Sequence, residues 1–345
     1  MKALAQLLKA VQACVWALTV GATAMAQDAP AQYQPLAAAS GKAHSVSVKF
    51  CLGYWGSDFA CKDGVVTAVL FEPQAAWSDL VLISHGAQGV DARHYEYADA
   101  LTKNGFAAVV IDHWTPRGID ITSQNYTQFT QRGGTTSSMA TDAIYVAQYM
   151  RSRFPNVKRV GLIGESMGGM AVLQLSKQRM LDLFTNGSLA QPGVPFEFPI
   201  QAMVGLYAAC VERVVDERFH PTPVLLISGE KDDHTLAEHC VEHQEWINTH
   251  GGSARAVVIP GVYHDFDGPR PVAFKPRAQN VSGCKNIVAG GIIRIVDSGK
   301  ELPNNQAGQS QLPKECAKWG ITSGYSGNRF VAVPIWMDFF KTQLR

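Results

Sequence analysis

The sequence lacks an excess of charge of either sign, and this absence narrows the classes of partner. It carries 30 Lys and Arg against 29 Asp and Glu, a formal net charge of +1, and no basic run. Binding to nucleic acid or to an anionic membrane surface relies on clustered positive charge. The balance therefore argues against both partners and favours a small-molecule substrate.

The sequence also lacks an apolar run long enough for a membrane span. Near its start, Lys2 and Lys9 accompany an apolar stretch over residues 10–24, and Ala24-Met25-Ala26 resembles an A-x-A cleavage site. That stretch is too short, and too rich in small residues, to cross a bilayer. We therefore predict a signal peptide over residues 1–26, a secreted or periplasmic protein, and no stable membrane anchor after cleavage.

Cysteine is scarce, but its number is informative. Of the seven cysteines, Cys14 lies in the predicted signal peptide, so six remain after processing. An even number in an exported chain favours disulfides, with buried free thiols as the alternative. The order of the cysteines along the chain suggests the pairs Cys51–Cys61, Cys210–Cys240 and Cys284–Cys316.

Short β-branched runs alternate with helix-length segments over most of the chain. We expect strands at residues 46–51, 65–71, 80–84, 107–112, 160–164, 202–207, 224–228 and 256–259, and helices at 91–104, 138–154, 233–250 and 330–342. From the third onward the strands are continuously apolar, as parallel strands covered on both faces are, whereas the first two suit an antiparallel edge. This pattern predicts an α/β fold with a mostly parallel, doubly wound sheet and helices on both faces.

Two stretches interrupt the alternation. Residues 179–200 contain Asn186-Gly187 and three prolines, so we expect a loop excursion there. Residues 268–327 are rich in Gly and Pro, and a structureless segment of that length is unusual in a compact domain. We predict a disulfide-pinned insertion before the last helix, with a short strand at 292–296. With a flexible leader at 27–43, this leaves a single domain over residues 44–345.

A glycine-flanked serine carries the strongest chemical signal. Gly164-Glu165-Ser166-Met167-Gly168 follows an expected strand and opens a helix. Strand, tight turn and helix form the context of the G-x-S-x-G elbow of α/β-hydrolases, where a strained turn exposes the serine Oγ. The alternative is a Gly-rich turn that holds a cofactor phosphate. We predict Ser166 as a nucleophile.

A serine nucleophile needs a base, and the base needs an acid that orients it. On this architecture both follow the serine along the chain, acid first. One later strand runs into Asp232 and Asp233, and the next runs into His264. We predict His264 as the base and Asp232 as the acid, because Asp233, the competing acid, is better placed to cap the following helix.

The predicted reaction also needs donors for an oxyanion. One is expected to be the backbone N–H of Met167, the residue after the nucleophile. The other should come from the glycine-containing loop after the third strand, Ser84 to Gly89, where we choose the N–H of Ala87.

Five segments, taken together, match one enzyme family. They are His85-Gly86-Ala87, residues 110–118, the serine elbow, Gly229 with Asp232, and residues 260–266. In combination they resemble the dienelactone hydrolase family, over residues 65–267 plus the last helix. The resemblance implies an α/β-hydrolase fold and hydrolysis of an ester or lactone through an acyl-enzyme, without metal or organic cofactor.

Three positions depart from the family's pattern. Ser166 stands where the type enzymes carry cysteine, and Gly86 where they carry a glutamate beside the nucleophile. Gly268 stands where they carry the arginine that binds the substrate carboxylate, with Arg270 and Arg117 as nearby candidates for that role. We therefore expect a secreted branch with a serine nucleophile and an ester substrate other than dienelactone.

Other functions stay open at this point. His239-Cys240-Val241-Glu242-His243 matches the H-x-x-E-H pattern of a zinc peptidase. No third ligand is evident and Cys240 is assigned to a disulfide, so we expect a solvated helix face and no metal site. A serine peptidase on the same fold would be recognised by amide turnover, and a catalytically silent binding protein by ligand binding that survives Ser166→Ala. The sequence does not indicate an oligomeric state.

Overall fold

The computed structural model describes residues 41–52, 60–121 and 131–345. The predicted signal peptide and most of the predicted leader lie outside this part of the chain. The first strand already begins at Lys42, so the last two residues of the predicted leader are part of the sheet. None of the helices in the described residues is both long and apolar enough to cross a membrane.

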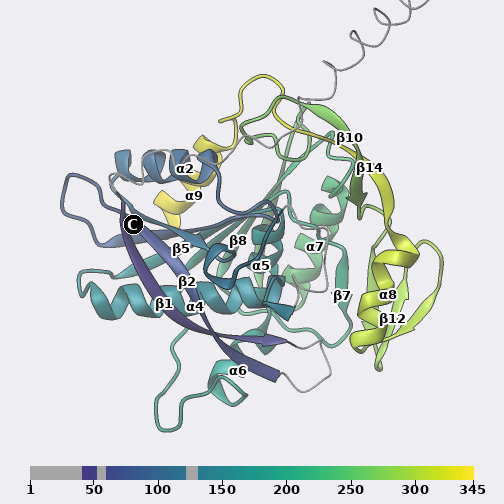
Figure 1. Cartoon of the computed structure of the whole chain (residues 1–345), viewed down its shortest axis with the longest axis horizontal. Coiled ribbons are helices and arrows are strands. Elements are labelled where there is room, and N and C mark those ends of the chain that lie inside the picture. Colours follow the sequence, from purple (N-terminus) through teal and green to yellow (C-terminus); the bar gives the residue numbers. More distant parts are fainter. Residues whose placement is uncertain (1–40, 53–59, 122–130) are drawn as a thin grey trace, which may run out of the picture. The chain divides into compact units, whose positions relative to one another are not determined.

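A mostly parallel sheet lies at the centre of the described chain (Figure 1). Its strand order is β1-β2-β4-β3-β5-β6-β8-β9. β2 pairs antiparallel with β1 and with β4, and all other neighbouring strands of this sheet pair parallel. The predicted antiparallel edge is thus confirmed. The bounds are β1 Lys42–Leu52, β2 Ala60–Phe71, β3 Asp79–Ser84, β4 Ala107–Asp112, β5 Arg159–Glu165, β6 Ala202–Leu206, β8 Pro223–Gly229 and β9 Ser253–Ile259.

Helices cover both faces of the sheet, as predicted. The helices α2 (Ala92–Lys103) and α9 (Val333–Gln343) bury apolar side chains in one core, and α4 (Thr136–Arg153), α5 (Met167–Leu175) and α7 (Ala237–Thr249) bury theirs in the other. Within β3, Leu80 and Leu82 belong to the second core, whereas Val81 and Ile83 belong to the first. This alternation explains why the central strands are apolar throughout.

The region 268–327 contains more regular structure than the sequence predicts. The strands β10 (Ala273–Asn280) and β14 (Lys318–Ser323) pair with each other. The strands β11 (Asn286–Ala289), β12 (Ile292–Ile295) and β13 (Glu301–Pro303) form a second small sheet with β7 (Glu212–Val214), and α8 (Gln306–Cys316) packs beside it. The predicted strand at 292–296 is confirmed as β12.

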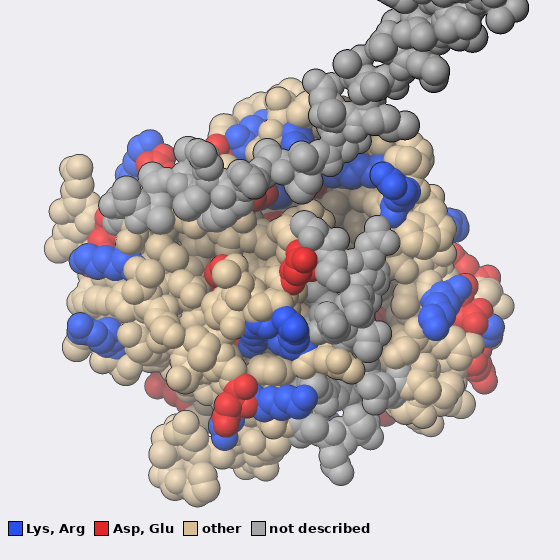
Figure 2. Space-filling model, viewed as in Figure 1, with Lys and Arg blue, Asp and Glu red and all other residues tan. Residues whose placement is uncertain are grey.

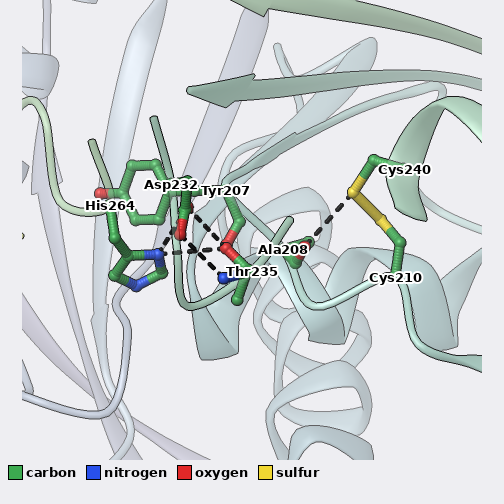
Figure 3. The surroundings of a disulfide bond; sticks show 7 residues. All are labelled: Tyr207, Ala208, Cys210, Asp232, Thr235, Cys240 and His264. Atoms are coloured by element: carbon green, nitrogen blue, oxygen red, sulfur yellow. Dashed lines mark hydrogen bonds and ion pairs between the residues drawn. A yellow bond between two sulfur atoms is a disulfide. The ribbon is translucent and has the colours of Figure 1, made fainter. Parts of the chain in front are cut away.

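Two disulfides link segments of the described chain, one within the insertion and one between the segment after β6 and α7. Cys284–Cys316 closes the insertion, and Cys210–Cys240 joins the segment after β6 to α7 (Figure 3). Both pairs are the ones expected from chain order. Cys51 stands opposite Cys61 in the register of β1 and β2, but the side chain of Cys51 lies outside the described residues.

Two expectations about local structure are wrong. Residues 178–185 form the helix α6 (Gln178–Thr185) rather than a loop, because Met180 and Phe184, one turn apart, are buried against the core. The helix predicted at 233–250 begins only at Ala237, with Leu236 as its N-cap residue. Asp233 therefore does not cap it.

Candidate active site

The turn that carries Ser166 is tight and strained. β5 ends at Glu165 and α5 begins at Met167, and between them Ser166 has φ 50° and ψ −108°. Glycine is required on both sides of it. A Cβ on Gly164 would lie 2.3 Å from the carbonyl oxygen of Gly168, and one on Gly168 would lie 2.4 Å from that of Ser84. The turn leaves Ser166 partly exposed at the carboxyl end of the sheet.

The three predicted triad residues meet at this edge. The Ser166 Oγ lies 3.2 Å from the His264 Nε2, and the His264 Nδ1 lies 2.8 Å from the Asp232 Oδ2. They follow β5, β9 and β8, parallel strands whose carboxyl ends lie at the same edge of the sheet, with β6 between β5 and β8. The structure thus brings serine, imidazole and carboxylate into one chain of hydrogen bonds, the arrangement that activates a serine.

Asp232 is held rigidly in a buried position. Its Oδ1 accepts hydrogen bonds from the backbone N–H groups of His234 and Thr235 at 2.9 and 2.8 Å. The Thr235 Oγ1 lies 2.7 Å from the Asp232 Oδ2, 3.1 Å from the His264 Nδ1 and 3.0 Å from the carbonyl oxygen of Tyr207 (Figure 3). Thr235 is not among the residues predicted from the sequence; the one signal for it is its place three residues after Asp232.

Asp233 has a different environment. Its carboxylate accepts the backbone N–H of Thr322 at 2.9 and 3.1 Å and so holds β14 beside the site. Its carbonyl oxygen accepts a hydrogen bond from Asn280 of β10. Asp233 thus fastens the insertion to the edge of the sheet where Ser166 and His264 meet, while the adjacent Asp232 faces His264.

Asp232 and His264 each stabilise the charged form of the other. Burial alone would lower the pKa of His264, but the charge of Asp232 and their hydrogen bond outweigh it and raise that pKa above the ordinary histidine value. Burial likewise opposes ionisation of Asp232, yet His264 and Thr235 lower its pKa. Asp232 is therefore ionised at neutral pH and stabilises a protonated imidazole.

The backbone N–H groups predicted as oxyanion donors are those of Ala87 and Met167. Within the described residues, neither the N–H of Ala87 nor that of Met167 donates to an acceptor. Met167 is the first residue of α5, where a helix leaves its N–H groups unpaired and its dipole favours negative charge. The loop of Ala87 is fixed by a bond from the Trp114 Nε1 to the Ala87 carbonyl oxygen at 3.3 Å.

Comparison with known proteins identifies the family. The model of the dienelactone hydrolase family matches residues 66–282, more than half of the chain. The chain belongs to the dienelactone hydrolase family. Its fold is accordingly the α/β-hydrolase fold, and the protein is a hydrolase.

Solved structures similar to this family member include enzymes from two bacteria. A dienelactone hydrolase from Anabaena variabilis is 20% identical with a TM-score of 0.43, and the match covers 67% of this chain and 91% of that one. Est1E from Butyrivibrio proteoclasticus is 15% identical with a TM-score of 0.41, covering 62% of this chain and 90% of that one. A search of curated proteins finds no match.

The structure removes one candidate for a substrate-binding arginine in this dienelactone hydrolase family member. Arg117 is almost fully buried and forms a two-pronged ion pair with Asp142 at 2.6 and 2.7 Å. Its guanidinium also lies over the ring of Phe50. Arg270 is exposed.

The H-x-x-E-H segment is not the solvated helix face that we expected. His239 and His243 are buried, because α7 packs this side against the core. Burial lowers the pKa of His243 to about 3, so its ring is neutral. Among the described residues, no group of three or more His, Cys, Asp or Glu side chains is arranged to hold a metal ion.

Proposed function

We propose that this protein hydrolyses carboxylic esters or lactones through an acyl-enzyme formed on Ser166. The observation that carries the proposal is the continuous hydrogen-bonded chain from the Ser166 Oγ through His264 to Asp232. The substrate is a small molecule. On the face seen in Figure 2, basic and acidic side chains are both present, most of them separated by uncharged residues.

The first half of the reaction forms the acyl-enzyme. The Ser166 Oγ attacks the ester carbonyl carbon while its proton passes to the His264 Nε2, and the carbonyl electrons move to the oxygen. The N–H groups of Ala87 and Met167 donate to this oxyanion. When the intermediate collapses, the bond to the alcohol oxygen breaks, and the alcohol leaves with the proton from the His264 Nε2. A lactone follows the same course but keeps its alcohol on the acyl chain.

The second half repeats the first with water. His264 takes a proton from water as the water oxygen attacks the acyl carbon, and the same two N–H groups hold the oxyanion. Collapse breaks the bond to the Ser166 Oγ, which regains its proton from His264 as the carboxylic acid leaves. Asp232 keeps the imidazole in the orientation that both halves need and stabilises its charged form.

A panel of chromogenic esters of graded acyl length, with matched anilides, tests the proposal. We expect turnover of at least one ester class and loss of that turnover in Ser166→Ala. Ser152→Ala is the matched control, because Ser152 is an exposed serine near the end of α4. No ester turnover by folded protein would refute the proposal, and faster turnover of anilides than of esters would replace it with a peptidase.

We further propose that the protein is exported as a secreted, serine-dependent branch of the family. The basic start, the apolar stretch over residues 10–24 and Ala24-Met25-Ala26 support this, as do the disulfides Cys210–Cys240 and Cys284–Cys316. N-terminal sequencing of the mature protein is expected to begin at Gln27. Intact residues 1–26 on protein kept in the cytoplasm would contradict export.

A further inference from the structure

A buried carboxylate stands directly beside the nucleophile and takes no part in the proposed reaction. Glu165 precedes Ser166 and is only 4% exposed. Its Oε1 accepts the backbone N–H of Gly86 at 2.5 Å, and Gly86 immediately precedes Ala87, whose N–H is the second donor of the proposed mechanism. One side chain thus links the serine turn to the loop that carries the second oxyanion donor.

The carboxylate fills the space above Gly86. A Cβ on Gly86 would lie 2.7 Å from the Glu165 Oε2 and 2.8 Å from its Oε1, closer than Cβ atoms approach in real structures. A side chain at position 86 would therefore have to displace the Glu165 carboxylate. This contact holds the loop together with two others, from the His85 Nδ1 to the Gly86 carbonyl oxygen at 2.7 Å and from Trp114 to the Ala87 carbonyl oxygen.

Arg93 and His94 hold the Glu165 carboxylate in place. The Arg93 Nη1 lies 3.8 Å from the Glu165 Oε2, and the His94 Nε2 lies 3.5 Å from its Oε1. Both cationic side chains are buried. Burial lowers the pKa of His94, but the carboxylates of Asp91 and Glu165 outweigh it and raise that pKa to about 9. Two side chains of α2 therefore lie against the Glu165 carboxylate.

Arg93 also reaches the segment that carries the base. Its Nη1 contacts the carboxylate of Asp265, the residue after His264, and lies 3.2 Å from the Asp267 Oδ1. Asp265 has φ 61°, a backbone conformation that costs free energy for a residue other than glycine. The contact with Arg93 stabilises that strained backbone conformation. It thereby also stabilises the orientation of the His264 side chain, which precedes Asp265 in the chain.

We propose that Glu165 and Arg93 are positioning residues that hold the oxyanion loop, the serine turn and the His264 segment in one fixed arrangement. Glu165 sets the place of the Ala87 N–H relative to that of Met167. Arg93 connects this pair of donors to the base. The inference rests on the proposed function, and its effect belongs to the transition state, because the oxyanion exists only after attack.

The first test is Glu165→Gln, which keeps the size of the side chain and removes its charge. If the amide oxygen still accepts from Gly86, the amide N–H groups point at the donors of Arg93 and His94. If the amide turns over, the Gly86 N–H loses its acceptor. Loss of a whole oxyanion donor lowers kcat by about 10²–10³-fold, so we expect a displaced donor to lower it by about 10- to 100-fold with KM within about threefold.

A transition-state analogue separates positioning from general damage. A trifluoromethyl ketone matched to the best ester adds to Ser166 and forms an oxyanion, whereas the product acid does not. In Glu165→Gln we expect the affinity for the ketone to fall by the same factor as kcat/KM, with unchanged affinity for the acid. Glu212→Gln is the matched control, because it removes a 2.7 Å ion pair with the buried Lys177, a contact that is no part of this cluster.

The second test approaches the same contact from the loop and keeps every charge. Gly86→Ala places a methyl group against the Glu165 carboxylate, and we expect a similar loss of kcat. Because both changes act on one contact, the loss in the double variant is expected to be clearly smaller than the product of the single losses. Gly86→Ala decides the matter if Glu165→Gln does not fold.

The outcomes distinguish this inference from the proposed function. Wild-type protein without ester turnover refutes the function itself. Wild-type turnover that depends on Ser166, with kcat and ketone affinity in folded Glu165→Gln and Gly86→Ala within twofold of wild type, overturns the positioning role alone. The positioning role is also overturned if Glu212→Gln loses as much kcat as Glu165→Gln does. It is overturned as well if the loss of kcat in the double variant equals the product of the two single losses.

Discussion

Asp232→Asn tests how the site controls the proton on His264. The Asp232 Oδ1 accepts two backbone N–H groups, those of His234 and Thr235, so an asparagine must keep its oxygen on that side. Its amide nitrogen then faces the His264 Nδ1, where the Asp232 Oδ2 now lies 2.8 Å away. An N–H that donates to Nδ1 moves the imidazole proton to Nε2, and that nitrogen can no longer accept the proton of Ser166.

The expected loss is large and confined to catalysis. In serine proteases the corresponding change lowers kcat by about 10⁴-fold, which is about 5 kcal/mol of transition-state stabilisation. We expect a loss of about 10³- to 10⁴-fold here, with KM within about threefold. The measurement is steady-state turnover of the best ester at saturating concentration, beside circular dichroism that shows an unchanged fold.

Asp233→Asn is the matched control on the neighbouring residue. Among the described residues, its carboxylate accepts one backbone N–H, that of Thr322, and asparagine keeps one acceptor oxygen for it. We expect kcat within about threefold of wild type and a loss of stability of about 1 kcal/mol or less. A folded Asp232→Asn enzyme within tenfold of wild type, or a larger loss in Asp233→Asn, would refute the assignment of the acid.

Three further predictions concern pH, Thr235 and the insertion. Because the base must be neutral and the pKa of His264 is raised, activity is expected to fall as the pH drops through a value above the ordinary 6.5; a pH–rate profile with its midpoint below 6.5 would contradict this. Thr235→Val removes the hydroxyl that contacts both Asp232 and His264, so kcat should fall about tenfold at constant KM in steady-state assays, and an unchanged kcat would count against the contact. Replacing both Cys284 and Cys316 by serine opens a link with a sequence separation of 32 and should lower the free energy of unfolding in urea by about 3–4 kcal/mol, whereas an unchanged midpoint would contradict a pinned insertion.

The central sheet could be predicted because its signals are local. The apolar runs of β3 and β5 bury both faces, and Asp91 before α2 is an N-cap whose side chain accepts from Arg93. The insertion could not be predicted in the same way. Its second sheet has a core of only four buried side chains and includes β7, which lies far earlier in the chain. Pairing over such a distance leaves no periodic pattern in either segment.

The proximity of Ser166, His264 and Asp232 could be predicted from order and position, since each follows a strand whose carboxyl end lies at one edge. The buried network around them could not. Arg93 sits in the first turn of a helix and looks like a surface cation, although it is buried between four carboxylates. Only the folded arrangement brings those carboxylates together. A charged residue inside the serine motif, Glu165, was the one signal that pointed to them.

Covalent labelling tests the nucleophile most directly. The enzyme is incubated with a fluorophosphonate, its mass is measured intact, and the modified peptide is sequenced by mass spectrometry beside Ser166→Ala. We predict one adduct per chain, located on Ser166, with ester turnover lost in proportion to labelling and no adduct in the variant. Complete inhibition without an adduct on Ser166, or ester turnover by Ser166→Ala at the wild-type rate, would contradict the account.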